Sequence, residues 1–182
     1  DAASCLLALN RLWGLGWPRS KLESLGLALG ADVPFFLRGR NAWIEGVGEK
    51  IAPLELPAAR FAVVKPPQGL ETRLIFSDPE LKRNTEPAII SGFAANPWSF
   101  GHNDLQPVAQ KLCPGVTQAL EWLAAQGLQG RMTGSGSAVF ALLAPGAAGL
   151  AAAPADWNGG GSVKECSNLE VHPLAGWAPS DD

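Results

Sequence analysis

A chain of 182 residues is long enough to bury a core and suits one large domain or two small ones. Hydrophobic residues make up 47% and charged residues 17% of it, an ordinary composition for a globular protein. The 14 basic and 17 acidic side chains give a net charge of -3, without a stripe of lysine and arginine. A nucleic-acid partner is not expected, because neutralising a phosphate backbone requires clustered cations.

The three cysteines lie far apart and form no Cys-x-x-Cys pair, so neither a disulfide framework nor a zinc site is indicated. A reducing, cytoplasmic setting is expected from this pattern. No apolar run approaches the roughly 20 residues that span a bilayer, so no membrane segment is predicted. His102 and His172 have no metal ligand at motif spacing, and no metal site is predicted.

Helices joined by glycine turns are predicted for the amino-terminal part of the chain. The expected elements are helices at residues 1–13, 21–29 and 32–37 and a strand at 42–45. Gly30 is a typical helix stop, and Asp32 is a typical N-cap for the short helix that follows. Pro53 and Pro57 mark a passage to a second lobe.

Strands and helices alternate in the second lobe, without an internal repeat, which favours an α+β arrangement of layers. The expected elements are strands at residues 61–65 and 138–143, helices at 70–76, 104–125 and 146–153, and a last extended segment that begins at 163.

Asp32 is the first residue that could carry chemistry. In the simpler interpretation its carboxylate caps the helix by accepting a backbone N–H. In the functional interpretation, the carboxylate accepts a proton or orients a hydroxyl. It lies on a loop at the start of a helix, where the helix dipole attracts anions. Both can hold together.

The small-residue string Met-Thr-Gly-Ser-Gly-Ser at residues 132–137 is followed by an apolar strand. It is either a tight turn or a loop whose backbone amides approach a phosphate, since glycine lets the main chain come close. It lacks the lysine and the spacing of a Walker A sequence.

Phe76 stands just before a polar stretch that ends at Thr85. It is either a core residue followed by a surface loop or a stacking platform for a nucleobase, because every base offers a π-face.

Six short segments occur in one order along the chain and together carry a family resemblance. They are Asp-Ala-Ala-x-x-Leu-x-Ala-Leu-Asn at residues 1–10, Leu-Gly-Ala-Asp-Val-Pro-Phe at 29–35, Glu-Gly-Val-Gly-Glu at 45–49, Ile-Phe-x-Asp-Pro-Glu-Leu-x-Arg-Asn-Thr at 75–85, Asn-Asp-Leu at 103–105 and Thr-Gly-Ser-Gly-Ser-Ala-Val-Phe-Ala at 133–141. Through them the chain resembles the GHMP small-molecule kinases, and within these the bacterial branch of the non-mevalonate isoprenoid pathway.

This resemblance implies an α+β, two-lobed GHMP kinase fold. Residues 1–56 would be the remainder of the ATP-binding amino-terminal domain, and residues 57–182 a ferredoxin-like carboxy-terminal domain. The implied enzyme is a bacterial, cytoplasmic, ATP-dependent kinase that phosphorylates the 2-hydroxyl of 4-diphosphocytidyl-2-C-methyl-D-erythritol. Its expected ligands are ATP and this cytidine-diphosphate-linked substrate, and Mg²⁺ is expected with ATP.

The resemblance also assigns roles to residues. Asp32 becomes the catalytic carboxylate that activates the hydroxyl, in a reaction that depends mainly on positioning and charge neutralisation. Phe76 lies beside the cytosine, and Thr72 makes a polar contact with the substrate. Four residues form the loop that supports the phosphate loop from the other lobe: Gly134, Ser135, Gly136 and Ser137.

The family's glycine-rich phosphate loop and its catalytic lysine belong to an amino-terminal segment that is expected to precede Asp1, so the 182 residues alone are expected to be inactive. Two alternatives stay open. One is another GHMP kinase, of the homoserine or mevalonate type, and the other is a non-catalytic binding module of the same fold.

Overall fold

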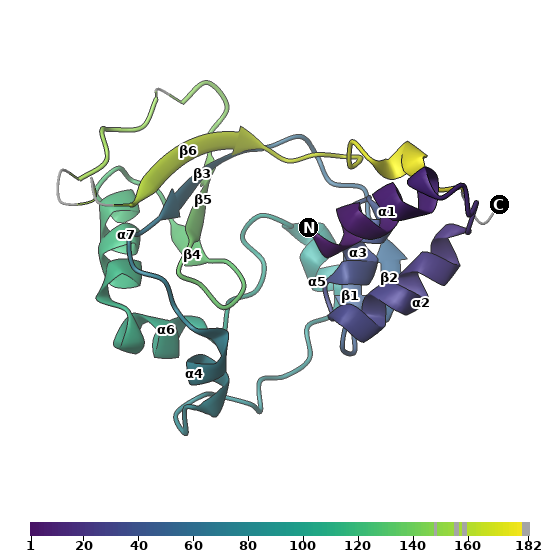
Figure 1. Cartoon of the computed structure of the whole chain (residues 1–182). Coiled ribbons are helices and arrows are strands. Elements are labelled where there is room, and N and C mark those ends of the chain that lie inside the picture. The colour runs from purple at the N-terminus through teal and green to yellow at the C-terminus, as the bar shows by residue number, and fades with distance from the viewer. Residues whose placement is uncertain (148, 155–156, 158–159, 180–182) are drawn as a thin grey trace. The chain divides into compact units, whose positions relative to one another are not determined.

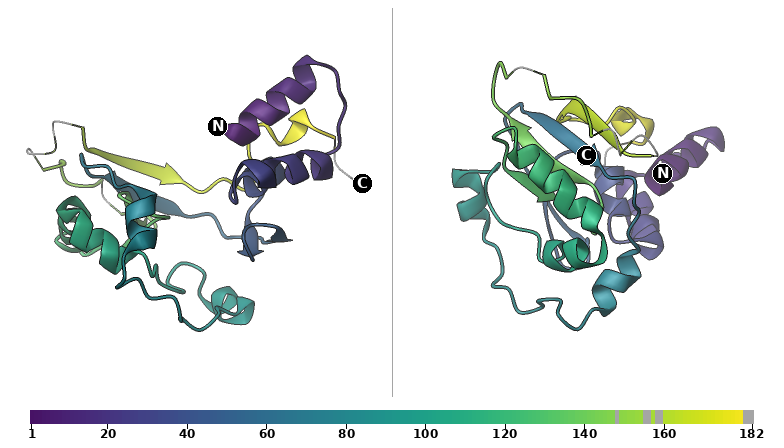
Figure 2. Two further views of the ribbon diagram at one scale, coloured as in Figure 1. Left: turned by 60° about the horizontal axis from the view of Figure 1, so that its bottom comes forward. Right: turned by 90° about the vertical axis from the view of Figure 1, so that its left-hand side faces the viewer.

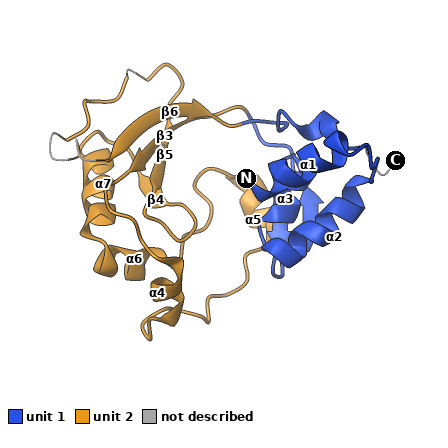
Figure 3. Cartoon of the chain, viewed as in Figure 1, with its two compact units in different colours: residues 1–57, 169–182 blue, residues 58–168 orange. Residues whose placement is uncertain are grey.

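Two units divide the chain, and each has a hydrophobic core of its own (Figure 3). The computed structural model describes residues 1–147, 149–154, 157 and 160–179. Unit 1 comprises residues 1–57 with 169–182, and unit 2 comprises residues 58–168. In the described part of the chain, no helix is both long and apolar enough to cross a bilayer.

Unit 1 begins with the three helices that the apolar spacing predicted: α1 (Ala2–Leu12), α2 (Arg19–Leu29) and α3 (Val33–Arg38) (Figure 1). Leu7, Leu22 and Leu37 are almost fully buried where these helices pack together. Asn10 is buried with them, at 3% exposure, and its side-chain amide pairs with both the N–H and the carbonyl of Trp17. These two bonds satisfy the buried amide and fix the chain between α1 and α2.

The hairpin of β1 (Ala42–Glu45) and β2 (Lys50–Pro53) follows α3. The carboxy-terminal segment then returns to unit 1, where Val171 forms a β-bridge with Arg40 and the short 3₁₀ helix η2 (Ala175–Trp177) follows. The guanidinium of Arg19 donates to the carbonyls of Leu37, Ala175 and Ala178, so one side chain fastens this segment to the end of α3.

Unit 2 is built on an antiparallel sheet of four strands: β3 (Arg60–Lys65), β4 (Gly130–Met132), β5 (Val139–Leu143) and β6 (Ser162–Ser167). Their order across the sheet is β4-β5-β3-β6, and each neighbouring pair is antiparallel. The described helices of the unit are α4 (Thr72–Ser77), α5 (Ile90–Ala95), α6 (Gln106–Leu112) and α7 (Pro114–Ala124). The strand order is that of a ferredoxin-like domain.

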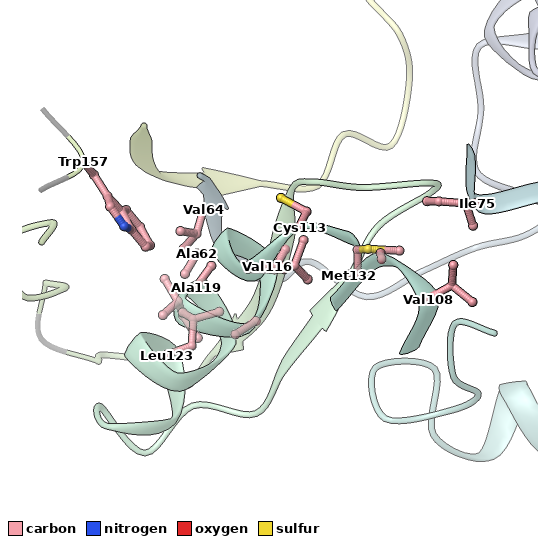
Figure 4. Close-up of a cluster of buried hydrophobic side chains, with 14 of the residues drawn as sticks. Ala62, Val64, Ile75, Val108, Cys113, Val116, Ala119, Leu123, Met132 and Trp157 are labelled. Atoms are coloured by element: carbon pink, nitrogen blue, oxygen red, sulfur yellow. The ribbon is translucent and has the colours of Figure 1, made fainter. Parts of the chain in front are cut away.

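The core of unit 2 lies between α7 and one face of the sheet (Figures 2 and 4). Side chains alternate along a strand, so Ala62 and Val64 point to this face together with their partners on β5. Val116, Ala119 and Leu123 recur at helical spacing on α7 and are fully buried against them. The opposite face carries half-buried aromatic rings, with Phe61 packed edge-on against Trp98 and Phe140.

The stretch at residues 104–125 is mostly helical, as predicted. It is divided at Cys113, because Pro114 has no N–H to continue α6 and instead starts α7. The helix expected at residues 146–153 is absent from the described residues of that stretch. Alanine favours a helix there, but Pro145, Gly146 and Gly149 oppose it.

Candidate functional site

Asp32 lies at the N-cap position of α3, as the sequence predicts, but its carboxylate makes no capping hydrogen bond. The residue is exposed and its backbone is already in the helical region, with φ -83° and ψ -15°. Pro34 in the first turn needs no N–H partner, which lowers the demand for a cap. The carboxylate of Asp32 therefore does not cap α3, which the simpler interpretation of this residue expected.

The turn between β1 and β2 packs directly on the residue before Asp32. Gly48 is buried at φ +113°, and a Cβ at this position would lie 2.0 Å from the carbonyl oxygen of Ala31. Only glycine permits both this conformation and this approach. The carboxylate of Glu49 accepts the Val47 N–H at 2.7 Å, and hydrogen bonds from the N–H groups of Glu49 itself and Val47 lower the pKa of that carboxyl.

In unit 2 the Gly-Ser loop, defined as residues 134–137, joins β4 to β5. Gly136 is at φ +86°, and a Cβ there would lie 2.8 Å from the sulfur of Met132, so the loop requires glycine at this point. The N–H of Gly136 donates to the carbonyl of Thr133 at 3.1 Å. Within the described part of the chain, the N–H groups of Gly134, Ser135 and Ser137 donate to no protein oxygen. They are available to an anion.

The carboxyl end of the Gly-Ser loop is anchored by a lysine that sequence reasoning missed. Ser137 is only 1% exposed, and its hydroxyl donates to the carbonyl of Gln68 at 2.6 Å while it accepts from Lys65 Nζ at 2.9 Å. Lys65 also donates to the carbonyls of Pro66 and Gln68. The signal in the sequence is a lysine that ends an apolar strand, which identifies no partner by itself.

The structure brings Thr72 and the Gly-Ser loop together. The hydroxyls of Thr72 and Ser135 lie 2.7 Å apart. Thr72 is the first residue of α4, and Phe76 follows one turn later on the same helix. The neighbouring Ile75 is fully buried, whereas Phe76 is 55% exposed. The structure therefore does not place Phe76 in the core, the simpler of its two interpretations.

An open hollow of about 730 Å³ lies beside these residues within unit 2. Phe76, Phe93 and Phe100 line it, together with Asn103, Thr133 and Gly134. Phe93 and Phe100 pack edge-on with their ring centroids 5.9 Å apart, so the lining combines aromatic rings with the start of the Gly-Ser loop. Such a mixture suits a ligand with a flat ring and polar substituents.

Asp104 also lines this hollow. Its carboxylate accepts hydrogen bonds from the hydroxyl of Thr85 and from His102, each at 2.9 Å. The bond from Thr85, followed by that from His102, lowers the pKa of Asp104. Among the described residues, no group of three histidine, cysteine or acidic side chains is placed to hold a metal ion.

Comparison with known proteins connects this geometry to a family. The family model described as GHMP kinases C terminal matches residues 85–155. The chain is 63% identical to the 4-diphosphocytidyl-2-C-methyl-D-erythritol kinase of Variovorax paradoxus (strain S110), over 98% of this chain and 64% of that protein. It is 66% identical to the kinase of the same name from Albidiferax ferrireducens, over 100% of this chain and 61% of that protein. The chain belongs to this kinase family.

A crystal structure of a 4-(cytidine 5'-diphospho)-2C-methyl-D-erythritol kinase agrees, with a TM-score of 0.60 and 37% identity. The match covers 77% of this chain and 53% of that one. The family and the mixed α and β fold that the ordered segments predicted are thereby confirmed. The chain spans only 58% to 64% of the length of the Variovorax, Albidiferax and Polaromonas kinases.

Proposed function

We propose that these residues form part of a kinase that transfers the γ-phosphoryl group of ATP to the 2-hydroxyl of 4-diphosphocytidyl-2-C-methyl-D-erythritol. The observation that carries the proposal is the Gly-Ser loop, whose unpaired N–H groups lie beside the exposed ring of Phe76 and the hydroxyl of Thr72. The loop suits the phosphates of ATP, and the exposed ring suits the pyrimidine of the cytidylated substrate. High identity to kinases named for this substrate supports the same choice.

In this proposal Asp32 accepts the proton of the 2-hydroxyl as the oxygen attacks the γ-phosphorus, and the bond from that phosphorus to the β,γ-bridging oxygen breaks to leave ADP. The Gly-Ser loop supports the phosphates, while Phe76 stacks on the cytosine and Thr72 contacts the substrate. Mg²⁺, when bound with ATP, neutralises phosphate charge. We assign residues 1–56 to the amino-terminal domain and residues 57–182 to the carboxy-terminal domain, whose last residues, from 169 on, return to unit 1. We place the enzyme in the bacterial cytoplasm.

The test uses a complete kinase, in which these 182 residues replace the matching part of the Albidiferax ferrireducens relative. ADP release is measured with Mg-ATP and, in turn, the cytidylated methylerythritol, homoserine and mevalonate. Turnover is expected with the cytidylated substrate alone, and removal of Mg²⁺ by a chelator should abolish it. Preference for homoserine or mevalonate, or no turnover while the parent relative is active, would contradict the proposal.

Phe76→Leu in this complete kinase is expected to raise KM for the cytidylated substrate by about 5- to 150-fold, because base–aromatic stacking is worth roughly 1–3 kcal/mol. KM for ATP should change little. Tm should also change little, because more than half of the ring is exposed. Leu74→Ala is the matched control, since Leu74 is a 50% exposed apolar residue of the same helix. A large fall in Tm with unchanged KM would instead assign Phe76 a packing role.

A further inference from the structure

Asn103 makes three hydrogen bonds with its side-chain amide. Its Nδ2 donates to the carbonyl oxygens of Met132 at 3.0 Å and Gly134 at 2.8 Å. Its Oδ1 accepts the N–H of Leu105 at 3.0 Å. Met132 is the last residue of β4, and Gly134 is the first residue of the Gly-Ser loop. Both donors of one amide are therefore used on the backbone that leads into this loop.

Peptide geometry links these carbonyls to the N–H groups that follow them. In a trans peptide the C=O and the next N–H point in opposite directions. A carbonyl of Gly134 that is held by Asn103 therefore turns the N–H of Ser135 away from Asn103. The carbonyl of Met132 belongs to the peptide whose N–H, that of Thr133, donates to Ala138 at 3.0 Å and closes the loop at its base.

Resting on the proposed function, we infer that Asn103 is a positioning residue for phosphoryl transfer, which orients the Ser135 N–H toward the phosphates of the bound nucleotide. A neutral amide suits this task, because it supplies two donors without adding a negative charge beside the phosphates. Aspartate would keep the acceptor for Leu105 and lose both donors. The bonds to Met132 and Gly134 can thus be separated from the bond to Leu105 by substitution.

The surroundings of Asn103 are held in place independently. Arg131 on β4 donates to the carbonyls of Phe100 and Gly101, at 2.6 and 2.9 Å, and to that of Trp98 at 3.2 Å. The far end of the Gly-Ser loop has its own anchor in the contact between Lys65 and Ser137. Loss of the Asn103 side chain should therefore release the start of the loop without unfolding either neighbour.

The test compares Asn103→Ala, Asn103→Asp and Asn103→Ser in the complete kinase. The alanine and aspartate variants should lose about 10- to 100-fold in kcat/KM for ATP, since misplacement of about 1 Å can cost 10²-fold. KM for the cytidylated substrate should stay nearly constant. The serine variant, which keeps one donor, should be intermediate. Gln126→Ala is the matched control, because the amide of Gln126 also donates to one backbone carbonyl and accepts one backbone N–H, and neither partner, Trp122 or Ala151, belongs to the Gly-Ser loop.

Hydrogen exchange gives a readout besides activity. Peptides that cover residues 133–137 should exchange faster in the alanine and aspartate variants, through the bonded N–H groups of Thr133 and Gly136, and peptides of β5 should not. Restoration of activity by aspartate would overturn the inference, because the bond to Leu105 would then suffice. Unchanged kinetics in the alanine variant, or equal losses for both ligands in proportion to a lower Tm, would overturn it as well.

Failure of the proposed function can be distinguished from failure of this inference. In that case the complete kinase without any substitution does not phosphorylate the cytidylated substrate. Calorimetric titration with Mg-ATP then still compares Asn103→Ala with the unmodified protein. Equal affinities would overturn the role of Asn103, and an affinity lower by about 10-fold would support it.

Discussion

Asp32→Asn in the complete kinase is expected to lower kcat by about 10²-fold or more, the scale of a lost general base. Asparagine has nearly the same shape and cannot accept the proton of the substrate hydroxyl. Thermal stability should hardly change, because the carboxylate makes no capping bond that could be lost. The measurement is ADP release at saturating substrates, together with Tm for both proteins.

Glu55→Gln provides the matched control for Asp32, since it removes one exposed carboxylate from the same unit. Its kcat should equal that of the unmodified kinase. Near-normal turnover of Asp32→Asn, or an equal loss in both variants, would remove Asp32 from the mechanism and leave it as a helix-start residue.

Gly48→Ala is expected to lower kcat by about 10- to 100-fold with a smaller effect on KM. A methyl group 2.0 Å from the carbonyl oxygen of Ala31 must displace either the turn or the residue that precedes Asp32. A displacement near 1 Å at a reacting group is enough for such a loss. The left-handed conformation adds strain of about 1–3 kcal/mol, so Tm should also fall.

Gly46→Ala separates strain from contact in that experiment. Gly46 also has a positive φ, +71°, but the nearest atoms to a Cβ there would be those of the flexible carboxylate of Glu49. Its Tm should fall in a similar way while its kcat stays close to normal. Equal losses of kcat in the two variants would show that the contact with Ala31 does not matter.

Much of the fold was predictable, because apolar spacing, with Gly30 and Asp32 as helix boundary signals, indicates α1 to α3, and apolar runs indicate the two central strands of unit 2. One local signal failed because others opposed it. The alanines after Pro145 favour a helix, but Pro145, Gly146 and Gly149 interrupt it. Composition alone does not decide between such opposing preferences.

The candidate site divides in the same way. The order of short segments pointed to Asp32, Thr72, Phe76 and the Gly-Ser loop, whose roles stay predictions. The bonds that hold the loop were not predictable. Lys65 and Ser137 meet only because β3 lies next to β5, and Asn103 reaches Gly134 across a long stretch of chain. Pairing between distant strands has to be known before such partners can be named.

Unit 1 is discontinuous in sequence, which has a consequence for biosynthesis. Residues 169–182 complete it, through the bridge of Val171 to Arg40 and the bonds from Arg19 to Ala175 and Ala178. On the ribosome, unit 2 is fully synthesised before these residues emerge, whereas the helices of unit 1 wait for their last partners. Because contacts of such long sequence separation form slowly, the final step of folding is expected to be the docking of this carboxy-terminal segment.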